Sequence, residues 1–98
     1  MKNVTTLDIA NVKKAWDMAS GCFSLFRNSM SVLEEACRNM CDSDINANIS
    51  SDENIYVETG DFSCRNANEF FHFCMNKDKD ELSEEDFKNK WNPLVNSF

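Results

Sequence analysis

The sequence predicts a mainly α-helical, compact single domain covering residues 1–98, with about four helices, a long acidic loop and a candidate short strand near residues 55–59. A chain of 98 residues is long enough for one hydrophobic core. Its apolar content of 42% and aromatic content of 11% are too high for a disordered chain, despite a net charge of −7. In several segments the apolar residues recur three and four positions apart, which is the spacing of a helix face.

The first predicted helix spans residues 7–20. Thr6 can cap its N-terminus, Asp8 falls in its first turn, where the helix dipole favours an acid, and Gly21 supplies a stop. The apolar residues that recur at helical spacing are Ile9, Val12, Trp16 and Ala19.

A second helix is predicted to end near Cys41, with a start anywhere from Cys22 to Ser31. Ser31 and Glu34 have the spacing of a capping box inside it. Its apolar stripe consists of Phe26, Met30, Leu33, Cys37 and Met40.

Residues 42–54 are rich in Asp, Asn and Ser, which favour turns and local side-chain hydrogen bonds. We therefore expect a surface loop with at most one short helical turn. Residues 55–59, Ile-Tyr-Val-Glu-Thr, have the β-branched and aromatic character of a strand, bounded by Gly60. The sequence indicates no partner for that strand.

Two further helices are predicted in the second half. Ser63 or Asn66 can cap the third helix, which is expected to break in the stretch 77–81. Ser83 can cap the fourth, which Pro93 is expected to end. The apolar residues assigned to these two helices are Ala67, Phe70, Phe71, Cys74, Phe87 and Trp91.

Charge is distributed unevenly along the chain. Residues 1–41 carry five Lys/Arg against four Asp/Glu, whereas residues 42–98 carry five against thirteen. From Asp42 to Asp61 there are six acidic residues and no Lys or Arg. Such a segment repels nucleic acid and anionic membranes and attracts basic proteins, so we expect neither direct nucleic-acid binding nor membrane binding.

The five cysteines are interpreted as mostly buried thiols. Their odd number, and the lack of an apolar export segment in the first residues, argue against a disulfide framework and favour a cytoplasmic protein. Zinc binding and redox use remain alternatives, because Cys37, Cys41 and Cys64 with His72 or Cys74 include enough soft ligands for a zinc site. Their spacing is not that of structural zinc pairs, so we expect no metal and no cofactor.

Residues 76–87 resemble an EF-hand calcium loop, because oxygen-bearing side chains alternate along them. The resemblance is partial. Asn76, Asp78 and Asp80 are one residue out of register with the closing half, the mid-loop Gly is missing, and Asp86 replaces the bidentate Glu. A solvated acidic linker into a capped helix is the favoured interpretation.

Nothing in the sequence predicts an enzyme. His72, the single histidine, lies among phenylalanines, and no Gly-rich turn is present to form an oxyanion or phosphate site. We therefore assign no catalytic residue.

The leading hypothesis is a small acidic protein that inhibits or neutralises a basic partner. Its most concrete form is a bacterial immunity- or antitoxin-type inhibitor of a nuclease toxin, because a nuclease must present Lys and Arg to phosphates. The predicted partner-binding residues are Asp42, Asp44, Asp52, Glu53, Tyr56, Glu58 and Asp61.

Three alternatives remain open. The chain can be a nucleic-acid mimic, made by a phage or mobile element, that blocks a DNA-binding protein. It can also be a helical adaptor or secretion-chaperone subunit whose aromatic and Met stripes engage a partner helix. The third is a metal-dependent module. For the acidic segment itself, the competing interpretation is a solvated loop.

Overall fold

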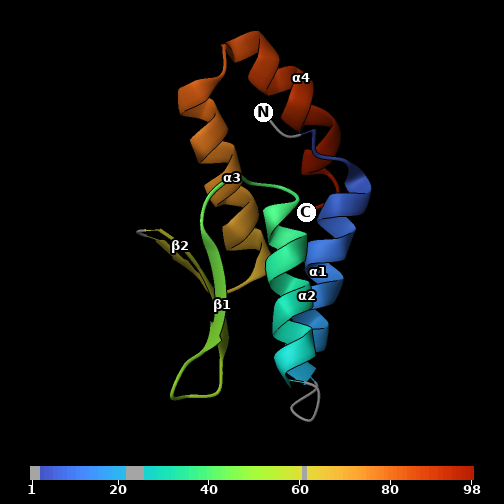
Figure 1. The fold of residues 1–98 in the computed structure, drawn as a ribbon. Helices are drawn as coiled ribbons and strands as arrows, with labels where there is room; N and C mark the ends of the chain where they lie inside the picture. Colours follow the sequence, from blue (N-terminus) through green and yellow to red (C-terminus); the bar gives the residue numbers. More distant parts are fainter. Residues whose placement is uncertain (1–2, 22–25, 61) are drawn as a thin grey trace.

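The structure, a computed structural model, describes residues 3–21, 26–60 and 62–98. This part of the chain folds into four helices and a three-stranded antiparallel sheet, which confirms the predicted mainly helical single domain (Figure 1). The elements in chain order are α1 (Thr6–Gly21), α2 (Phe26–Arg38), β1 (Ile45–Ile49), β2 (Ile55–Thr59), β3 (Phe62–Cys64), α3 (Ala67–Glu81) and α4 (Glu84–Val95).

The N-terminus of α1 is capped one residue earlier than predicted. Thr5, not Thr6, is the capping residue: its backbone N–H donates to Asp8 Oδ2 at 2.9 Å, and the Asp8 N–H donates back to Thr5 Oγ1 at 3.3 Å. This reciprocal pair satisfies two N–H groups at the helix start, which have no partner inside the helix.

Helix α3 is capped by Asn66, one of the two predicted candidates. The Glu69 N–H donates to Asn66 Oδ1 at 2.9 Å, and the Glu69 carboxylate accepts from the Arg65 N–H at 3.1 Å. Ser63, the other candidate, belongs to β3.

The predicted break at residues 77–81 is wrong, because α3 continues to Glu81. Asp78, in that stretch, accepts a hydrogen bond from Trp91 Nε1 at 2.9 Å and forms an ion pair with Lys90. These contacts join the last turns of α3 to α4 and favour the helical conformation of a polar stretch.

Helix α4 begins as predicted, with the Asp86 N–H donating to Ser83 Oγ at 3.2 Å. It does not end at Pro93 but runs to Val95. A proline lacks an N–H and clashes with the preceding turn, yet here it lies in the last turn of α4, in which Trp91 and Leu94 are buried. Packing of these two residues holds the turn helical.

The largest correction concerns residues 42–54, which do not form one long loop. Residues 45–49 form β1, which pairs with β2 from Ile45 opposite Thr59 to Ile49 opposite Ile55. The strand predicted at 55–59 is confirmed and lies in the centre of the sheet, because β3 pairs along its other side. The period-two pattern of Ile45, Ala47 and Ile49 outweighs the weak strand preference of the asparagines between them.

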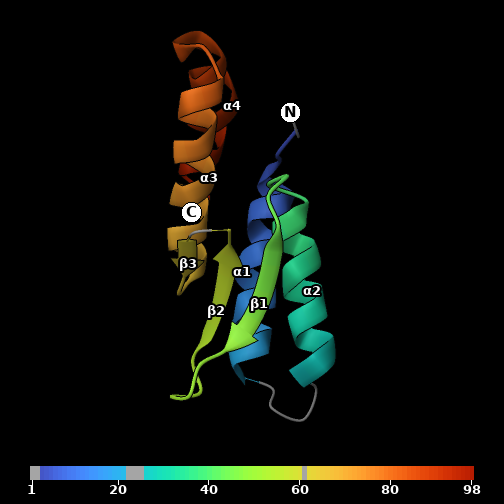
Figure 2. The ribbon, with the colours of Figure 1, turned by 60° about the vertical axis from the view of Figure 1, so that its left-hand side comes forward.

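Helices α1 and α2 cover one face of the sheet, as Figure 2 shows. Six side chains on the helix-facing side of the sheet are buried: Ile45, Ala47, Ile55, Val57, Thr59 and Cys64. Ile49 and Phe62, on the same side, are half-buried and exposed, respectively. The opposite face alternates with these positions and is open.

The apolar stripes predicted on the second and third helices lie inside the domain. Met30, Leu33, Cys37 and Met40 of the first stripe are buried, and the side chain of Phe26 lies outside the described residues. From the other stripe, Phe70, Phe71 and Cys74 are buried together with Trp91 of α4. None of the described helices is both long and apolar enough to span a membrane.

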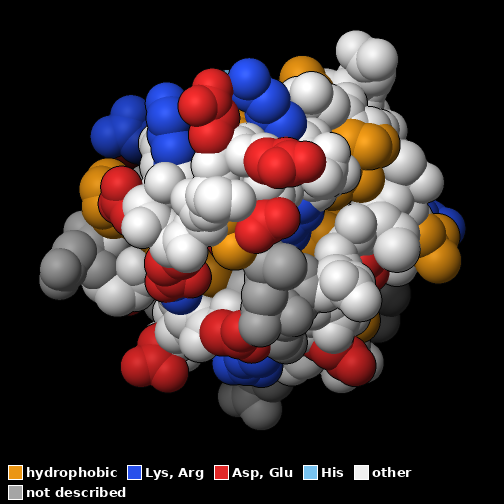
Figure 3. All heavy atoms as spheres, turned by 90° about the horizontal axis from the view of Figure 1, so that it is seen from above, with side chains coloured by type: hydrophobic (Ala, Val, Ile, Leu, Met, Phe, Trp, Pro, Cys, Tyr) orange, Lys and Arg blue, Asp and Glu red, His pale blue; other side chains and the backbone are white. Residues whose placement is uncertain are grey.

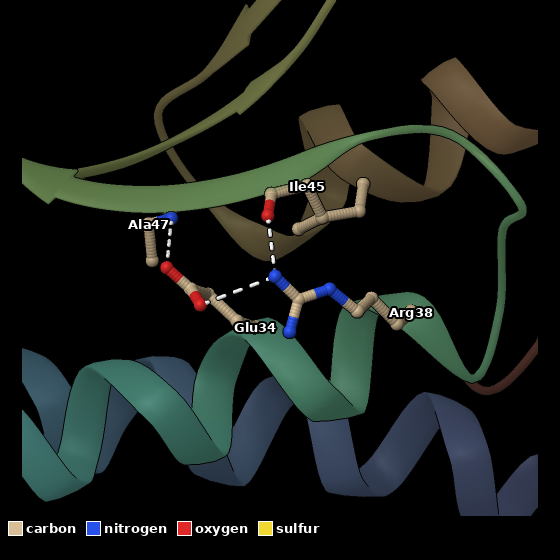
Figure 4. Close-up of polar contacts among 4 residues, drawn as sticks. All are labelled: Glu34, Arg38, Ile45 and Ala47. Atoms are coloured by element: carbon tan, nitrogen blue, oxygen red, sulfur yellow. Dashed lines mark hydrogen bonds and ion pairs between the residues drawn. The ribbon is translucent and has the colours of Figure 1, made fainter.

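Side chains of α2 clamp the outer edge of β1 (Figure 4). Glu34 Oε1 accepts from the Ala47 N–H at 2.9 Å, and Arg38 Nη2 donates to the Ile45 carbonyl at 2.9 Å and to Glu34 Oε2 at 3.3 Å. The sequence interpretation paired Glu34 with Ser31 in a capping box. In the structure Glu34 supplies an acceptor to the edge strand instead, as a neighbouring strand would.

Candidate partner-binding site

The β-hairpin divides the predicted acidic cluster between its two ends. Asp42 and Asp44 precede β1 at one end, whereas Asp52 and Glu53 lie in the turn at the other. A five-residue strand separates the ends by about 17 Å, at about 3.4 Å per residue. The four acids therefore do not form one continuous patch.

The remaining three predicted residues are Tyr56, Glu58 and Asp61. Tyr56 and Glu58 lie on β2 and are half-buried, and Asp61 lies outside the described residues. Together with their cross-strand neighbours they form the open sheet face, which contains no Lys or Arg and is defined here by Asn46, Asn48, Tyr56, Glu58 and Ser63.

A surface hollow of about 730 Å³, here called the hairpin hollow, lies between α1, the hairpin turn and the start of α3. Two aromatic residues line it, Tyr56 and Trp16, the latter only 6% exposed. Two carboxylates, Asp17 and Asp52, and one cation, Arg65, also line it. The other lining residues are Ser20, Ser50, Asn54, Ile55, Ser63 and Asn66.

This combination suits a positively charged side chain. Carboxylates form charge-assisted hydrogen bonds with guanidinium and ammonium groups, and aromatic rings bind cations over their faces. The aliphatic stem of a Lys or Arg can also pack against an aromatic surface while its head reaches the acids.

The hairpin turn holds Asp52 beside the hollow. The Ser50 N–H donates to the Asn54 carbonyl at 2.9 Å, and the Glu53 N–H donates to the Ser50 carbonyl at 2.9 Å. These bonds enclose a three-residue loop whose last residue, Glu53, has φ of 64°. That position favours Gly, so Glu53 is held in a backbone conformation that costs an L-residue energy.

Asp42 and Asp44 line a different hollow of about 400 Å³, here called the α2–β1 hollow. Arg38 of α2 lines it as well. The segment from Asp42 to Asp61 contains no Lys or Arg, but the fold brings Arg38 to one end of the hairpin and Arg65 to the other. The local charge is therefore less negative than the linear sequence indicates.

Sequence reasoning missed Trp16 and Asp17 as site residues. Trp16 was assigned to the apolar face of its helix, which is correct, and Asp17 had no distinguishing feature. Their part in the hollow arises because α1 packs beside β2, a contact between segments about forty residues apart in the printed sequence. No local pattern carries that information.

The stretch that resembles an EF-hand does not form a calcium-binding loop. Residues 76–81 belong to α3, so their oxygen-bearing side chains project around a helix and do not follow a loop that wraps an ion. Acidic and basic side chains are interspersed on this end of the molecule (Figure 3). Within residues 3–21, 26–60 and 62–98, no group of three or more His, Cys, Asp or Glu side chains is arranged to hold a metal.

The four described cysteines, Cys37, Cys41, Cys64 and Cys74, are buried free thiols, as the sequence predicted. Cys22 lies outside the described residues. His72 is exposed, with its ring edge-on to Phe98 at a centroid distance of 6.2 Å.

No protein-family model, curated protein or solved structure matches this chain. Its own residues are therefore the basis for inferring function. Among the predicted residues, Asp52 and Tyr56 lie at the hairpin hollow, and Glu53 follows Asp52 in the turn. Asp42 and Asp44 lie at the opposite end of the hairpin, and Glu58 pairs with Asn46 near that end.

Proposed function

We propose that the protein binds and neutralises a basic protein partner through the hairpin hollow and the adjoining open sheet face. The observation that carries this proposal is the hollow, which Asp17 and Asp52 line together with Tyr56 and the largely buried Trp16. A protruding Lys or Arg of the partner fits its chemistry and serves as the anchor of the interface. Anchors of this kind, a cation against aromatic residues, dominate many protein interfaces.

The net charge of −7 supports the same partner class. Long-range attraction raises the rate at which a basic protein meets an acidic one, especially at low salt. Arg65 limits the negative charge inside the hollow. The geometry therefore favours a single cationic side chain at this point over a row of them.

The most concrete form of the proposal is an immunity- or antitoxin-type inhibitor of a nuclease toxin. A nuclease active site is lined with Lys and Arg that bind phosphate, and a narrow acidic hairpin can enter such a cleft. A nucleic-acid mimic has less support, because mimicry of a phosphate backbone requires a continuous row of acids and the hairpin separates these. An adaptor acting through the aromatic and Met stripes also has less support, since those side chains form the domain's own core.

Affinity purification of the tagged protein from its native cells at low salt tests the proposal. We expect the captured proteins to include a basic protein in stoichiometric amount. The double substitution Asp17→Lys/Asp52→Lys should lower its recovery at least tenfold, because it places two cations beside Arg65 in the hollow. Asp80→Lys/Glu81→Lys makes the same change in net charge on the last turn of α3 and should leave recovery nearly unchanged.

Two outcomes would contradict the proposal. One is that the stoichiometric partner is not basic. The other is that both double variants lose it equally, which would mean that only total charge matters and that the hollow is no anchor.

A further inference from the structure

Four thiols from separate elements are buried in the core, a feature that the proposed binding function does not use. Cys37 lies on α2, Cys41 in the connection after it, Cys64 at the end of β3 and Cys74 on α3. A charge on Cys41 raises the pKa of each of the other three. Lys77, three residues after Cys74 on α3, places its Nζ 4.0 Å from Cys41 Sγ, which brings this face of α3 next to Cys41. The fold thus brings together cysteines that are as many as 37 positions apart in the printed sequence.

Cys41 has an environment that stabilises a thiolate. Its Sγ lies 3.3 Å from Ser43 Oγ and 4.0 Å from Lys77 Nζ, and Lys77 Nζ also donates to Ser43 Oγ at 2.7 Å. A hydrogen bond with Cys74 is the largest effect on Cys41. Together with Ser43 and Lys77, it lowers the pKa of Cys41 to about 5 in spite of burial. Ordinary cysteines titrate near 8.5.

Cys74 has the opposite character. The hydrogen bond with Cys41 and burial both raise its pKa. Burial also raises the pKa of Cys37, and it raises that of Cys64 to about 11. The Ser43 and Lys77 contacts, which Cys41 makes and Cys74 does not, therefore mark Cys41 as the nucleophilic thiol of the pair.

The two thiols also differ in access. Cys41 lines the α2–β1 hollow and is 6% exposed, whereas Cys74 is 3% exposed and does not line that hollow. A small reagent that enters the hollow meets Cys41 first.

We propose that Cys41 and Cys74 form a reactive dithiol that small organic disulfides oxidise to an intramolecular disulfide. The Cys41 thiolate attacks one sulfur of the reagent, forming a mixed disulfide and releasing one thiolate. Cys74 then loses its proton to that thiolate or to solvent and attacks Cys41 Sγ. The second step forms the Cys41–Cys74 bond and releases the second thiol. The reagent disulfide is reduced to two thiols as the protein dithiol is oxidised.

The Ser43 and Lys77 contacts distinguish Cys41 from a purely structural thiol, because an inert buried cysteine has apolar surroundings and a raised pKa. Zinc binding by the cluster is not supported, because the described residues include no metal-binding arrangement. The inference is independent of the proposed partner.

The test uses the reduced full-length protein and bis(2-hydroxyethyl) disulfide at about pH 6, followed by intact mass and by fragmentation of digested peptides. In the wild type we expect a transient single adduct on Cys41 and then loss of two hydrogens with a Cys41–Cys74 crosslink. Cys74→Ser should accumulate the adduct, Cys41→Ser should form neither product in the cluster, and Cys64→Ser should behave as the wild type. Digestion assigns any reaction at Cys22 separately.

The rate of adduct formation should change little between about pH 6 and pH 8, because the Cys41 thiolate is already formed. An ordinary thiol would react about a hundredfold more slowly at pH 6 than at pH 8. Lys77→Met should slow the reaction at pH 6 several-fold. Cys74, Ser43 and Lys77 lower the pKa of Cys41. The other charged or titratable groups around it are Cys37, Cys64, Arg38, Asp42 and Asp44. A rate that rises with pH as for an ordinary thiol, or a crosslink to Cys37 or Cys64 in place of Cys74, would overturn the proposal.

Discussion

At the scale of single residues, Glu53 combines an unfavourable backbone conformation with an exposed acidic side chain. Its φ of 64° falls in the left-handed region, which costs an L-residue about 1 kcal/mol or more. Residues retained in strained positions often serve function. Glu53 extends from the tip of the hairpin that we propose enters the partner.

Glu53→Gly should therefore raise the free energy of unfolding, by about 0.5–1 kcal/mol, because glycine adopts this conformation without strain. Urea unfolding followed by circular dichroism measures the change. Glu53→Ala, which keeps the strain, is the matched control and should leave stability within about 0.5 kcal/mol. An equal gain from both variants would trace the effect to charge and not to the backbone.

Asp78 is a second residue with a specific role, because its carboxylate accepts a hydrogen bond from Trp91 Nε1 and forms an ion pair with Lys90. Trp91 is fully buried, so removing the acceptor leaves its N–H unpaired in the core. Asp78→Ala should lower the free energy of unfolding by about 2–3 kcal/mol. Asp80→Ala, an exposed neighbour on the same helix, should change it by less than about 0.5 kcal/mol in the same urea titration. Comparable losses in both variants would argue against a specific role for Asp78.

At the scale of elements, the helices were predictable and the sheet was only partly so. Helix caps and apolar spacing are local, and they predicted the existence of all four described helices and the cap at Ser83. The errors at Pro93 and at residues 77–81 have one cause. In both places tertiary contacts, of Trp91 and Leu94 or of Asp78, outweigh a local preference against the helix. Strand β1 was missed because its partner begins several residues later and because asparagine is uncommon in strands.

The Glu34–Arg38 clamp predicts the behaviour of the sheet edge. Glu34→Ala removes the acceptor for the Ala47 N–H and exposes the edge of β1, so the free energy of unfolding should fall by about 1–2 kcal/mol. An uncovered edge strand also favours pairing between chains, so self-association in sedimentation velocity should increase. Glu35→Ala, on the exposed side of the same helix, should do neither. Unchanged stability and oligomeric state in Glu34→Ala would show that the clamp is dispensable.

At the scale of the whole molecule, the sequence indicated which segment carries the candidate site, but not which residues of the fold line it. The charge imbalance and Tyr56 pointed to the hairpin, and Asp52 and Tyr56 do line its hollow. The grouping of all seven predicted residues into one surface was not supported, because the hairpin separates Asp42 and Asp44 from Asp52 and Glu53. Trp16, Asp17 and Arg65 joined the site only through packing between distant segments, and composition and spacing do not record such contacts.

The most direct test of the central claim is the affinity of the purified basic partner for the wild type and for Asp17→Lys/Asp52→Lys, measured by calorimetry at about 0.1 M and about 1 M salt. We expect wild-type affinity to fall at least tenfold at high salt, where charge attraction is screened within about 3 Å. The variant should bind at least tenfold more weakly than the wild type at low salt, with a smaller dependence on salt. Affinity that is unaffected by both salt and the double substitution would contradict the claim that an acidic hairpin hollow anchors a basic partner.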